Sequence, residues 1–566
     1  MDLKLKLISF LLISGYIFLL IVTFIYNNSL ESDFRELSSS LLENNKYATL
    51  VDSKGHFIVS NQQKYEAWID LEYMKRRGKY DENKYILNRK FGDEELQNKK
   101  FIKWGSYNSY EEAYLSLGVL NKFSRIYPVT ERLYNELFTL GQVTGKFGKT
   151  VYGIEPFLFE SGALQNNEEI ILSIDLKMQQ IAYEELMKTV IEESAEGGIV
   201  IIMETSTGKI RASVSIYPWN IGYMGYIEPG STLKPLLVAL AIDENIITPN
   251  DRYYSGYEYY PTGKNNFRVT ESQGYGFGEI GLKETLVYSS NVAITKIMKQ
   301  VLEEFSNVWL YEKLLNLGFG NKTGIEFKGE INGVLPSPNN WYEITPYQIA
   351  LGQGIGVTPI QLVASFNALA NNGKYVSPTF LEKKEVKSKQ IFSETSSNLV
   401  KDWLAYTVIN GTARKAYKEG LKLAGKTGTA QKAQSGIGYV EGSYYSLFSG
   451  FIPATNPQYT ALVIIDNPQK EYYGGEVAAP ILTNIFYRYY KDSEYVDNKN
   501  KIVFYEGIMP DLTDFSVVEA VNVLLNLGID SKNIIITGNG DRIITQSKDP
   551  FTSLKESDII YLHTLK

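Results

Sequence analysis

The sequence predicts an α+β protein built from several domains. In its central part, short strand-like runs come first, helical stretches follow, and further strand-like runs close the region. This order predicts a sheet covered by a helical subdomain. With 566 residues, of which 44% are hydrophobic and 21% charged, the chain has room for about three or four domains and no composition typical of long disorder.

The composition excludes several kinds of chemistry. There is no cysteine, which rules out disulfides, thiolate zinc sites, iron–sulfur clusters and a cysteine nucleophile. The two histidines, His56 and His563, lie near opposite ends, so a Ser-His-Asp triad in the middle of the chain is impossible, and we expect neither a metal nor another cofactor. A net charge of -7 leaves no overall basic footprint for nucleic acid. Acyl-transfer chemistry in this chain needs a base other than histidine.

The N-terminus predicts a membrane anchor. Leu7 to Tyr26 is a run of 20 residues without a charge, which as a helix spans about 30 Å, the thickness of a bilayer core. Lys4 and Lys6 precede the run, so we expect residues 1–6 in the cytoplasm and the chain after the helix outside the cell. A cleaved signal peptide is the alternative, but no small-x-small cleavage site follows the run.

Residues 31–164 predict a mixed N-terminal domain. We expect a short polar helix over 31–45, a strand over 47–51 and a hairpin turn over 52–55. The charge-rich stretch 64–100 predicts exposed helices.

Residues 165–490 predict the sheet and its helices. The expected strands are 170–174, 198–203, 209–215, 422–429, 445–451 and 460–466. The expected helices are one capped by Asp175 and ending at 188, then 231–245, 281–315 with a break near Ser289, 340–372 with Gly/Pro breaks, and 479–490. Residues 491–506 predict a linker, and residues 507–566 a small last unit.

A serine and a lysine three residues apart form the first candidate site. Ser231 and Lys234 lie where a helix is expected to begin, so their side chains would share one face of it. Pro235 lacks an N–H and fits only near the first turn, which supports a helix start here. The helix dipole would favour negative charge at Ser231, and a desolvated lysine amine near other cations can act as a base. The pair would supply a serine nucleophile without histidine.

A Ser-x-Asn pattern forms the second candidate site. Ser289 and Asn291 interrupt a helical stretch. A hydroxyl and an amide there can relay a proton and hold a substrate amide. The same pattern occurs elsewhere in the chain, and a capping break between two helices is the structural alternative.

A Lys-Thr-Gly-Thr run on an expected strand forms the third candidate site. Lys426 and the hydroxyls of Thr427 and Thr429 can hold a substrate carboxylate. Gly428 permits another chain to approach the backbone closely. The backbone N–H of Thr429 would form an oxyanion hole with that of Ser231.

Two of these patterns occur a second time. Ser206 and Lys209 also fit Ser-x-x-Lys, but they flank the expected hairpin turn and would not share a helix face. Residues 322–324 are a second Lys-Thr-Gly that follows a glycine-containing turn. We interpret both as structural.

The three candidate sites together resemble a known signature. Ser-x-x-Lys on a helix, then Ser-x-Asn, then Lys-Thr-Gly is typical of penicillin-binding proteins and serine β-lactamases. The surrounding residues, Glu228–Pro235, Gly411–Ala413 and Ala424–Ala430, resemble a class B penicillin-binding protein, a monofunctional transpeptidase. The resemblance covers 165–490 and implies the penicillin-binding transpeptidase fold, an antiparallel sheet flanked by helices with an all-α subdomain.

The resemblance also implies roles for the motif residues. Ser231 would be the acylated nucleophile and Lys234 the general base. The residues implied to be catalytic are Ser231, Lys234 and Ser289. The residues implied to bind the stem peptide and its terminal carboxylate are Asn291, Lys426, Thr427, Gly428 and Thr429.

The flanking regions resemble accessory domains of the same family. Arg125–Pro128 and Gly153–Glu155 resemble parts of its non-catalytic pedestal, or dimerisation, domain over 31–164. Residues 507–566, including Met509–Leu512, resemble a PASTA domain, which is small and α/β. The alternatives are a rigid spacer for the pedestal and a stability or spacing role for the last unit.

The function implied by the resemblance is a membrane-anchored peptidoglycan D,D-transpeptidase. It would attack the D-Ala–D-Ala bond of a stem peptide, release D-Ala and pass the acyl group to a neighbouring amine, and β-lactams would trap the acyl-enzyme. The layout resembles division- or sporulation-type members, which implies a place at the septum and, as partners, a SEDS-family membrane glycosyltransferase and divisome proteins.

Other functions remain as alternatives at this stage. They are a D,D-carboxypeptidase, in which water is the acceptor, and a catalytically dead cell-wall-binding receptor, which would have no physical reason to keep a Ser/Lys pair. A β-lactamase would need neither the pedestal nor the anchor. Residues 31–165 do not resemble the glycosyltransferase module of a bifunctional class A enzyme.

Overall fold

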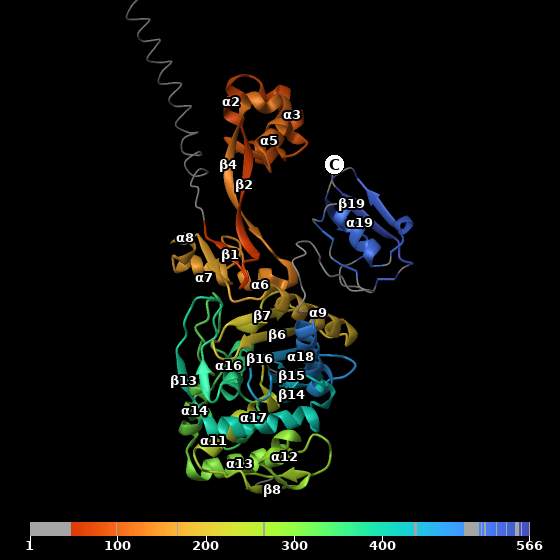
Figure 1. The fold of residues 1–566 in the computed structure, drawn as a ribbon. Helices are drawn as coiled ribbons and strands as arrows, with labels where there is room; N and C mark the ends of the chain where they lie inside the picture. The colour runs from red at the N-terminus through yellow and green to blue at the C-terminus, as the bar shows by residue number, and fades with distance from the viewer. Residues whose placement is uncertain are drawn as a thin grey trace, which may run out of the picture. The chain divides into compact units, whose positions relative to one another are not determined.

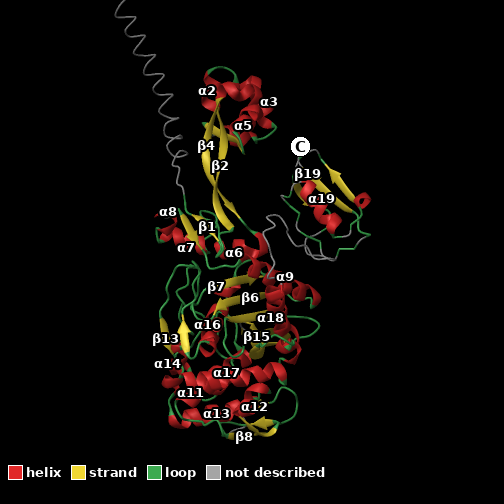
Figure 2. Cartoon of the chain, in the orientation of Figure 1, coloured by secondary structure: helices red, strands yellow, loops and turns green. Residues whose placement is uncertain are grey.

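The computed structural model describes most of the chain after residue 46 (Figures 1 and 2). The described residues are 47–97, 99–166, 168–263, 267–434, 438–491 and 509–564, the last with gaps at 511, 514, 516, 528, 539, 541, 549–553 and 556. The expected cytoplasmic tail, the membrane helix over 7–26 and the polar helix over 31–45 lie outside them, as do residues 492–506 of the expected linker. Within the described ranges, no helix has both the length and the apolar character needed to cross a membrane. The chain divides into two compact units, Met1–Lys491 and Asp492–Lys566.

The first described part of this unit is a five-stranded sheet that carries a helical head (Figure 1). Its strands are β1 (Thr49–Val51), β2 (Phe57–Asp70), β3 (Phe101–Tyr107), β4 (Ser124–Tyr134) and β5 (Glu169–Ile171). The strand order is β3-β2-β1-β5, and β4 also pairs with β2. The expected hairpin turn after β1 is confirmed, because β1 and β2 are antiparallel.

The interpretation of 64–100 as exposed helices is wrong in its first part. Strand β2 continues to Asp70 and pairs along this stretch with β3 and β4. Both partner strands lie far away in sequence, so the local charge pattern does not reveal the pairing. Helices begin only at residue 71. The helices of the head and of the segment leading to the next sheet are α2 (Leu71–Arg76), α3 (Tyr80–Asn88), α4 (Asp93–Gln97), α5 (Tyr110–Leu117), η1 (Gly118–Phe123), η2 (Leu137–Thr139), α6 (Leu140–Thr144), α7 (Ile154–Glu160) and α8 (Ala163–Asn166).

The second sheet of this unit is antiparallel throughout and has the order β14-β15-β16-β6-β7. Its strands are β6 (Gly197–Glu204), β7 (Ile210–Ser215), β14 (Ala424–Gln434), β15 (Gly438–Ile452) and β16 (Tyr459–Asp466). Each matches an expected strand, whereas the strand expected over 170–174 ends at Ile171 as β5 of the first sheet. Strand β14, which carries the Lys-Thr-Gly run, is at one end of the order, so no described strand pairs with its outer edge.

Helices cover both faces of this sheet (Figure 1). One face is covered by α9 (Leu176–Glu192) and α18 (Gly474–Lys491), and the other by α16 (Pro359–Ala370) and α17 (Glu394–Ile409). Asp175 caps α9 by accepting a hydrogen bond from the N–H of Met178 at 3.2 Å, as expected. Burial on both faces explains why β6 and β16 are almost continuously apolar.

Helix α18 begins five residues before the expected start at 479. Pro480 lies inside α18. The helix starts at Gly474, where a Cβ would lie 2.3 Å from the carbonyl oxygen of Gly428. The N-terminus of α18 is therefore packed closely against β14.

The helical subdomain supplies the remaining motifs. Its main elements are η3 (Gly230–Leu233), α11 (Lys234–Asp243), α12 (Leu282–Val287), α13 (Asn291–Glu304), α14 (Asn307–Asn316) and α15 (Thr345–Ala350). The expected break near Ser289 is confirmed between α12 and α13. Shorter elements are α10 (Ile221–Met224), β8 (Arg252–Ser255), β9 (Glu258–Tyr259), β10 (Val269–Thr270), β11 (Gly278–Gly281), η4 (Pro338–Asn340), β12 (Lys374–Val376), β13 (Ser388–Gln390) and η5 (Arg414–Ala416).

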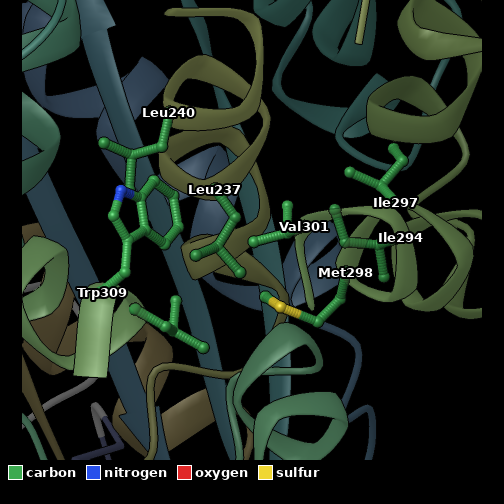
Figure 3. A pocket seen from close by; sticks show the side chains of 8 residues that line it. Leu237, Leu240, Ile294, Ile297, Met298, Val301 and Trp309 are labelled. Atoms are coloured by element: carbon green, nitrogen blue, oxygen red, sulfur yellow. The ribbon is translucent and has the colours of Figure 1, made fainter. Parts of the chain in front are cut away.

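An apolar pocket lies between α11, α13 and α14 (Figure 3). Full burial of an aliphatic side chain of the kind that lines this pocket stabilises a fold by about 1.5–3 kcal/mol. The contacts hold α11 against α13, so the first residues of these helices, Lys234 and Asn291, are brought to fixed positions. The lining residues are Leu237, Leu240, Ile294, Ile297, Met298, Val301, Trp309 and Leu310.

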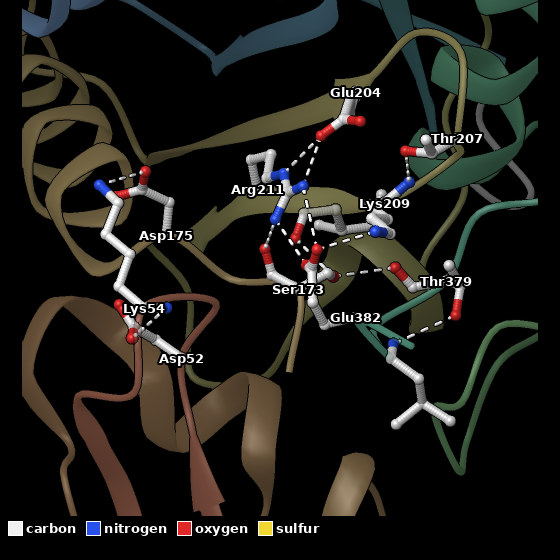
Figure 4. Close-up of polar contacts among 12 residues, drawn as sticks. Asp52, Lys54, Ser173, Asp175, Glu204, Thr207, Lys209, Arg211, Thr379 and Glu382 are labelled. Carbon is white, nitrogen blue, oxygen red and sulfur yellow. Dashed lines mark hydrogen bonds and ion pairs between the residues drawn. The ribbon is translucent and has the colours of Figure 1, made fainter. Parts of the chain in front are cut away.

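Polar contacts join the first sheet to the second (Figure 4). Asp52, in the turn after β1, accepts a hydrogen bond from the N–H of Leu176 at the start of α9. Lys54 forms an ion pair of 2.9 Å with Asp175. Next to them, Arg211 of β7 donates to the carbonyl oxygen of Ser173 at 3.0 Å. The hairpin of the first sheet is thus bound to the N-terminus of α9.

The second unit is small and α/β. It contains α19 (Val517–Asn526), η6 (Ser531–Asn533), β17 (Ile534–Thr537), β18 (Ile543–Gln546) and β19 (Ile560–Thr564). The sheet order is β17-β19-β18, with β17 parallel and β18 antiparallel to β19. Leu524, Ile543 and Leu562 are buried in its core.

Candidate active site

Ser231 lies in η3, directly before α11, and is half-buried. The preceding Gly230 has φ +54°, a left-handed conformation that glycine adopts without strain. Its N–H donates to the carbonyl oxygen of Gly352 at 3.0 Å. Pro235 is in the first turn of α11, as predicted. The turn that presents Ser231 is therefore held at its N-terminal end by a backbone hydrogen bond and continues directly into α11.

Lys234 is fully buried and its amine faces the Ser-x-Asn motif. The amine donates to the carbonyl oxygen of Ser289 at 2.8 Å, to Asn291 Oδ1 at 2.7 Å and to Ser289 Oγ at 3.4 Å. These three bonds use all three donors of a charged ammonium. None of these three bonds goes to Ser231, the residue whose side chain was expected to share a helix face with Lys234. Loss of one proton would free a lone pair on the amine.

Lys426 reaches the same serine from the other side. It is also fully buried, and its amine donates to Ser289 Oγ at 2.8 Å and to the carbonyl oxygen of Thr427 at 3.0 Å. Ser289 Oγ therefore accepts hydrogen bonds from two buried lysines, one on α11 and one on β14. The structure brings all three motifs together around this hydroxyl.

Ser289 adopts an unusual backbone conformation. Its φ is +59°, in the left-handed region, which costs a non-glycine residue about 1–2 kcal/mol. Strained residues of this kind cluster at functional sites. Ser289 lies between α12 and α13, and in this conformation its carbonyl faces Lys234 and its hydroxyl faces Lys426.

Burial changes the acidity of both lysines. Removal from water lowers the pKa of Lys234 to about 7, and the negative charge of Glu271 opposes this shift. Burial, together with the positive charge of Lys234, holds the pKa of Lys426 well below its ordinary value. An amine with a pKa near neutrality is suited to take up and return a proton at physiological pH.

The Lys-Thr-Gly strand packs against the segment that carries Ser231. A Cβ at Gly428 would lie 3.1 Å from Thr232 Cγ2 and 3.3 Å from the carbonyl oxygen of Pro229. Only a residue without a side chain gives this spacing without displacement. The outer edge of β14 thus lies beside η3, which brings the backbone of Thr429 and that of Ser231 into one region.

Sequence reasoning assigned no role to several residues of this site, although Thr412 lies in the range Gly411–Ala413 that carries part of the resemblance. Thr412 Oγ1 lies 2.7 Å from Thr427 Oγ1 and so orients a hydroxyl of the Lys-Thr-Gly-Thr run. Gly475 is required because a Cβ there would lie 1.8 Å from the carbonyl oxygen of Thr412. The adjacent pair Gly474-Gly475 was a usable signal of close approach. Glu271, a buried carboxylate next to Asn291, had no local signal at all.

The repeated patterns lie outside this cluster. Ser206 is exposed in the turn between β6 and β7, and Lys209 forms an ion pair of 2.8 Å with Glu382. At the second Lys-Thr-Gly, the N–H and hydroxyl of Thr323 bind the Glu330 carboxylate at 2.7 and 2.5 Å. Both have structural partners. In the part of the chain that the structure describes, no group of three or more potential ligand side chains is arranged to hold a metal ion.

Comparison with known proteins agrees with this geometry. A family model described as the penicillin binding protein transpeptidase domain matches residues 198–487, just over half of the chain. The chain belongs to the penicillin-binding protein transpeptidases. The matched range contains all three motifs, and the expectation of a transpeptidase fold in this penicillin-binding protein is confirmed.

Individual relatives give the same family. The chain is 30% identical over 429 residues to Stage V sporulation protein D of Bacillus subtilis. The aligned region covers 69% of this chain and 64% of that protein. It is 29% identical over 340 residues to the probable peptidoglycan D,D-transpeptidase PenA of Neisseria flavescens, covering 57% and 82%. This penicillin-binding protein thus spans under two thirds of the length of the first of these relatives.

Among solved structures, the transpeptidase domain of Burkholderia pseudomallei penicillin-binding protein 3 is similar. The identity is 28% and the TM-score 0.53, over 58% of this chain and 98% of that domain. The similarity therefore extends over nearly the whole of that domain.

Proposed function

We propose that this chain is a serine D,D-transpeptidase that cross-links peptidoglycan stem peptides. The observation that carries the proposal is the bridging of two buried lysines, Lys234 and Lys426, by the hydroxyl of Ser289. Together with Ser231, three residues before Lys234, this arrangement offers a nucleophile, a base of suitable pKa and a proton relay without any histidine.

In the first half-reaction, Ser231 Oγ adds to the carbonyl carbon of the D-Ala–D-Ala bond. Its proton passes to the neutral amine of Lys234, and the N–H groups of Ser231 and Thr429 stabilise the oxyanion. The C–N bond then breaks, and the leaving amine of D-Ala takes up a proton through Ser289. An ester on Ser231 and free D-Ala result.

In the second half-reaction, an amine of a neighbouring stem peptide adds to the ester carbonyl. The amine loses a proton to Lys234, the C–O bond to Ser231 breaks, and the proton returns to Ser231 Oγ. A new peptide cross-link forms and the enzyme is regenerated. Splitting one difficult step into two easier ones is the advantage of covalent catalysis.

The substrate is held from two sides in this proposal. Lys426 and the hydroxyls of Thr427 and Thr429 bind the terminal carboxylate, a role that suits a cation beside two hydroxyl groups. Asn291 binds the stem-peptide backbone. Gly428 leaves room for the close packing that sets the distance between β14 and η3.

Labelling with a fluorescent penicillin tests the proposal. The full-length protein in detergent should be labelled, and the adduct should map to the peptide that contains Ser231. Ser231→Ala should abolish labelling, whereas Ser206→Ala, the serine of the second Ser-x-x-Lys pattern, should leave it unchanged. An adduct at Ser206 would overturn the assignment of the site.

The fate of the acyl group distinguishes transpeptidation from the alternatives. With a stem-peptide donor and an amine acceptor, released D-Ala should be matched by a new cross-linked product. Release matched by hydrolysed product alone would make the enzyme a D,D-carboxypeptidase. The absence of both labelling and D-Ala release would favour a catalytically dead receptor.

We infer further that residues 7–26 anchor the enzyme in the cell membrane, with residues 1–6 in the cytoplasm and the catalytic part outside. The uncharged run and its basic N-terminal flank support this. A role in septal wall synthesis, in division or sporulation, draws support from the similarity to a sporulation protein. Family analogy adds a SEDS-family glycosyltransferase and divisome proteins as partners, a pedestal in residues 31–164 and a PASTA domain in residues 507–566.

A further inference from the structure

One buried carboxylate lies behind the Ser-x-Asn motif. Glu271 follows β10 and is 3% exposed. It accepts hydrogen bonds from Ser255 Oγ at 2.7 Å, from Ser290 Oγ, and from the backbone N–H groups of Asn291 and Val292 at 2.8 and 3.1 Å. Two of these donors are the first N–H groups of α13, which have no partner within the helix.

Glu271 and its neighbour fix the orientation of Asn291. Glu271 binds the backbone N–H of Asn291, and the carbonyl oxygen of Thr270 accepts from Asn291 Nδ2 at 2.9 Å. With its nitrogen used in this way, the side-chain amide turns Oδ1 toward Lys234, 2.7 Å away. The short segment of Thr270 and Glu271 therefore sets which end of the amide faces the lysine.

The charge of Glu271 also acts on Lys234. Two charged groups face the Lys234 amine: Glu271 after β10, whose charge raises the pKa of Lys234, and Lys426 on β14, whose own pKa is lowered by the charge of Lys234. Lys426 disfavours a second positive charge, and Glu271 favours it. The carboxylate thus opposes both burial and the neighbouring cation.

We propose that Glu271 is a positioning residue of the active site: it holds Asn291 and the start of α13 in register with Lys234, and its charge sets how readily the Lys234 amine releases its proton. The inference rests on the proposed role of Lys234 as general base. Glu271 touches no substrate and acts through Lys234 and Asn291. Without the charge of Glu271, the Lys234 amine would be neutral over a wider pH range. Without the hydrogen bonds of Glu271, Asn291 would lose its orientation.

The pH dependence of acylation separates the two effects. The rate constant for acylation by a fluorescent penicillin should rise with pH as Lys234 becomes neutral, which gives an acidic limb in the pH profile. Glu271→Gln removes a negative charge, which makes the ammonium less stable, so the limb should move to lower pH by about one unit, the lower end of the range for a nearby opposite charge. Glu271→Asp keeps the charge, so its limb should stay near that of the wild type while its maximal rate falls.

Glu330→Gln is the matched control. Glu330 is likewise buried and likewise accepts backbone N–H and hydroxyl hydrogen bonds, but from Thr323 in a distant motif. Its variant should leave the limb in place. Thermal melting of all three variants reports folding, and Glu271→Asp tests the inference even if Glu271→Gln does not fold.

Three results would overturn the inference. The first is an acidic limb of Glu271→Gln at the same pH as that of the wild type. The second is an acidic limb of Glu271→Asp displaced by about one pH unit. The third is an acidic limb that Glu330→Gln displaces as far as Glu271→Gln does. Failure of the proposed function looks different: the wild type itself would then lack an acidic limb, which would overturn the base role of Lys234 and this inference together.

Discussion

Replacement of Lys234 by arginine tests whether this residue is a base or only a positive charge. The Lys234 amine lies in a fully buried position and donates to the carbonyl oxygen of Ser289 and to Asn291 Oδ1. Arginine keeps the charge but does not lose its proton in proteins, and its planar fork does not match the position of a single amine. We therefore expect Lys234→Arg to lose acylation although the charge is conserved.

The size of the effect follows from the protonation state of Lys234. With a pKa of about 7, about half of the Lys234 amines are neutral at pH 7, against about one in 2,500 for a lysine with an ordinary pKa near 10.4. A positioned general base contributes about 10²–10⁴ to the rate. Lys234→Arg should therefore lower the second-order acylation rate constant at least about 100-fold. In the wild type, the same constant should rise about tenfold from about pH 6 to about pH 8, because the neutral fraction rises from about one tenth to about nine tenths.

The assay is the acylation of the purified, folded full-length protein by a labelled penicillin across the neutral pH range. Lys209→Arg is the matched control, because Lys209 belongs to the second Ser-x-x-Lys pattern and pairs with Glu382, a contact that arginine can keep. Its rate should equal that of the wild type. A loss below about tenfold in Lys234→Arg, about 1.4 kcal/mol, would refute the base role and leave Lys234 as an electrostatic group.

Other changes test the strained serine, the close packing and the division of the chain. Ser289→Ala and Ser289→Gly should both lower the acylation rate constant at least about tenfold. The glycine variant should be more stable than the alanine variant by about 1–2 kcal/mol, because φ is +59° at this position. Equal melting temperatures of the two variants would contradict the strain. Gly428→Ala places a Cβ 3.1 Å from Thr232 Cγ2, so a displacement of a few tenths of an ångström should slow acylation about tenfold, and an unchanged rate would show that the segment moves freely. Removal of residues 492–566, a separate compact unit, should leave acylation nearly unchanged; a large fall with the melting temperature of the first unit preserved would show that the second unit shapes the site.

Much of the fold followed from local patterns. The hairpin of β6 and β7, the cap of α9 by Asp175 and the break near Ser289 were all predicted, because capping, turn chemistry and side-chain periodicity act over a few residues. The three motifs were found for the same reason, since each is contained in three or four consecutive residues. The absence of cysteine and of central histidines further narrowed the chemistry to a serine with a lysine base.

Contacts between distant segments decided the rest. Residues 64–70, the second half of strand β2, were predicted as helix because their partner strands lie dozens of residues away. Lys234 donates to Ser289 and Asn291, which the packing of α13 against α11 brings within hydrogen-bond distance of the amine.

The sequence by itself determined which residue types are available for catalysis and roughly where the helices and strands begin. Only the tertiary structure decided how the lysines share Ser289, how far burial lowers the pKa of Lys234, and that Glu271 faces the start of α13. The physical reason is that desolvation and electrostatic interactions depend on everything within a few ångströms in space. Only a few of the groups that surround a side chain in space are its neighbours along the chain.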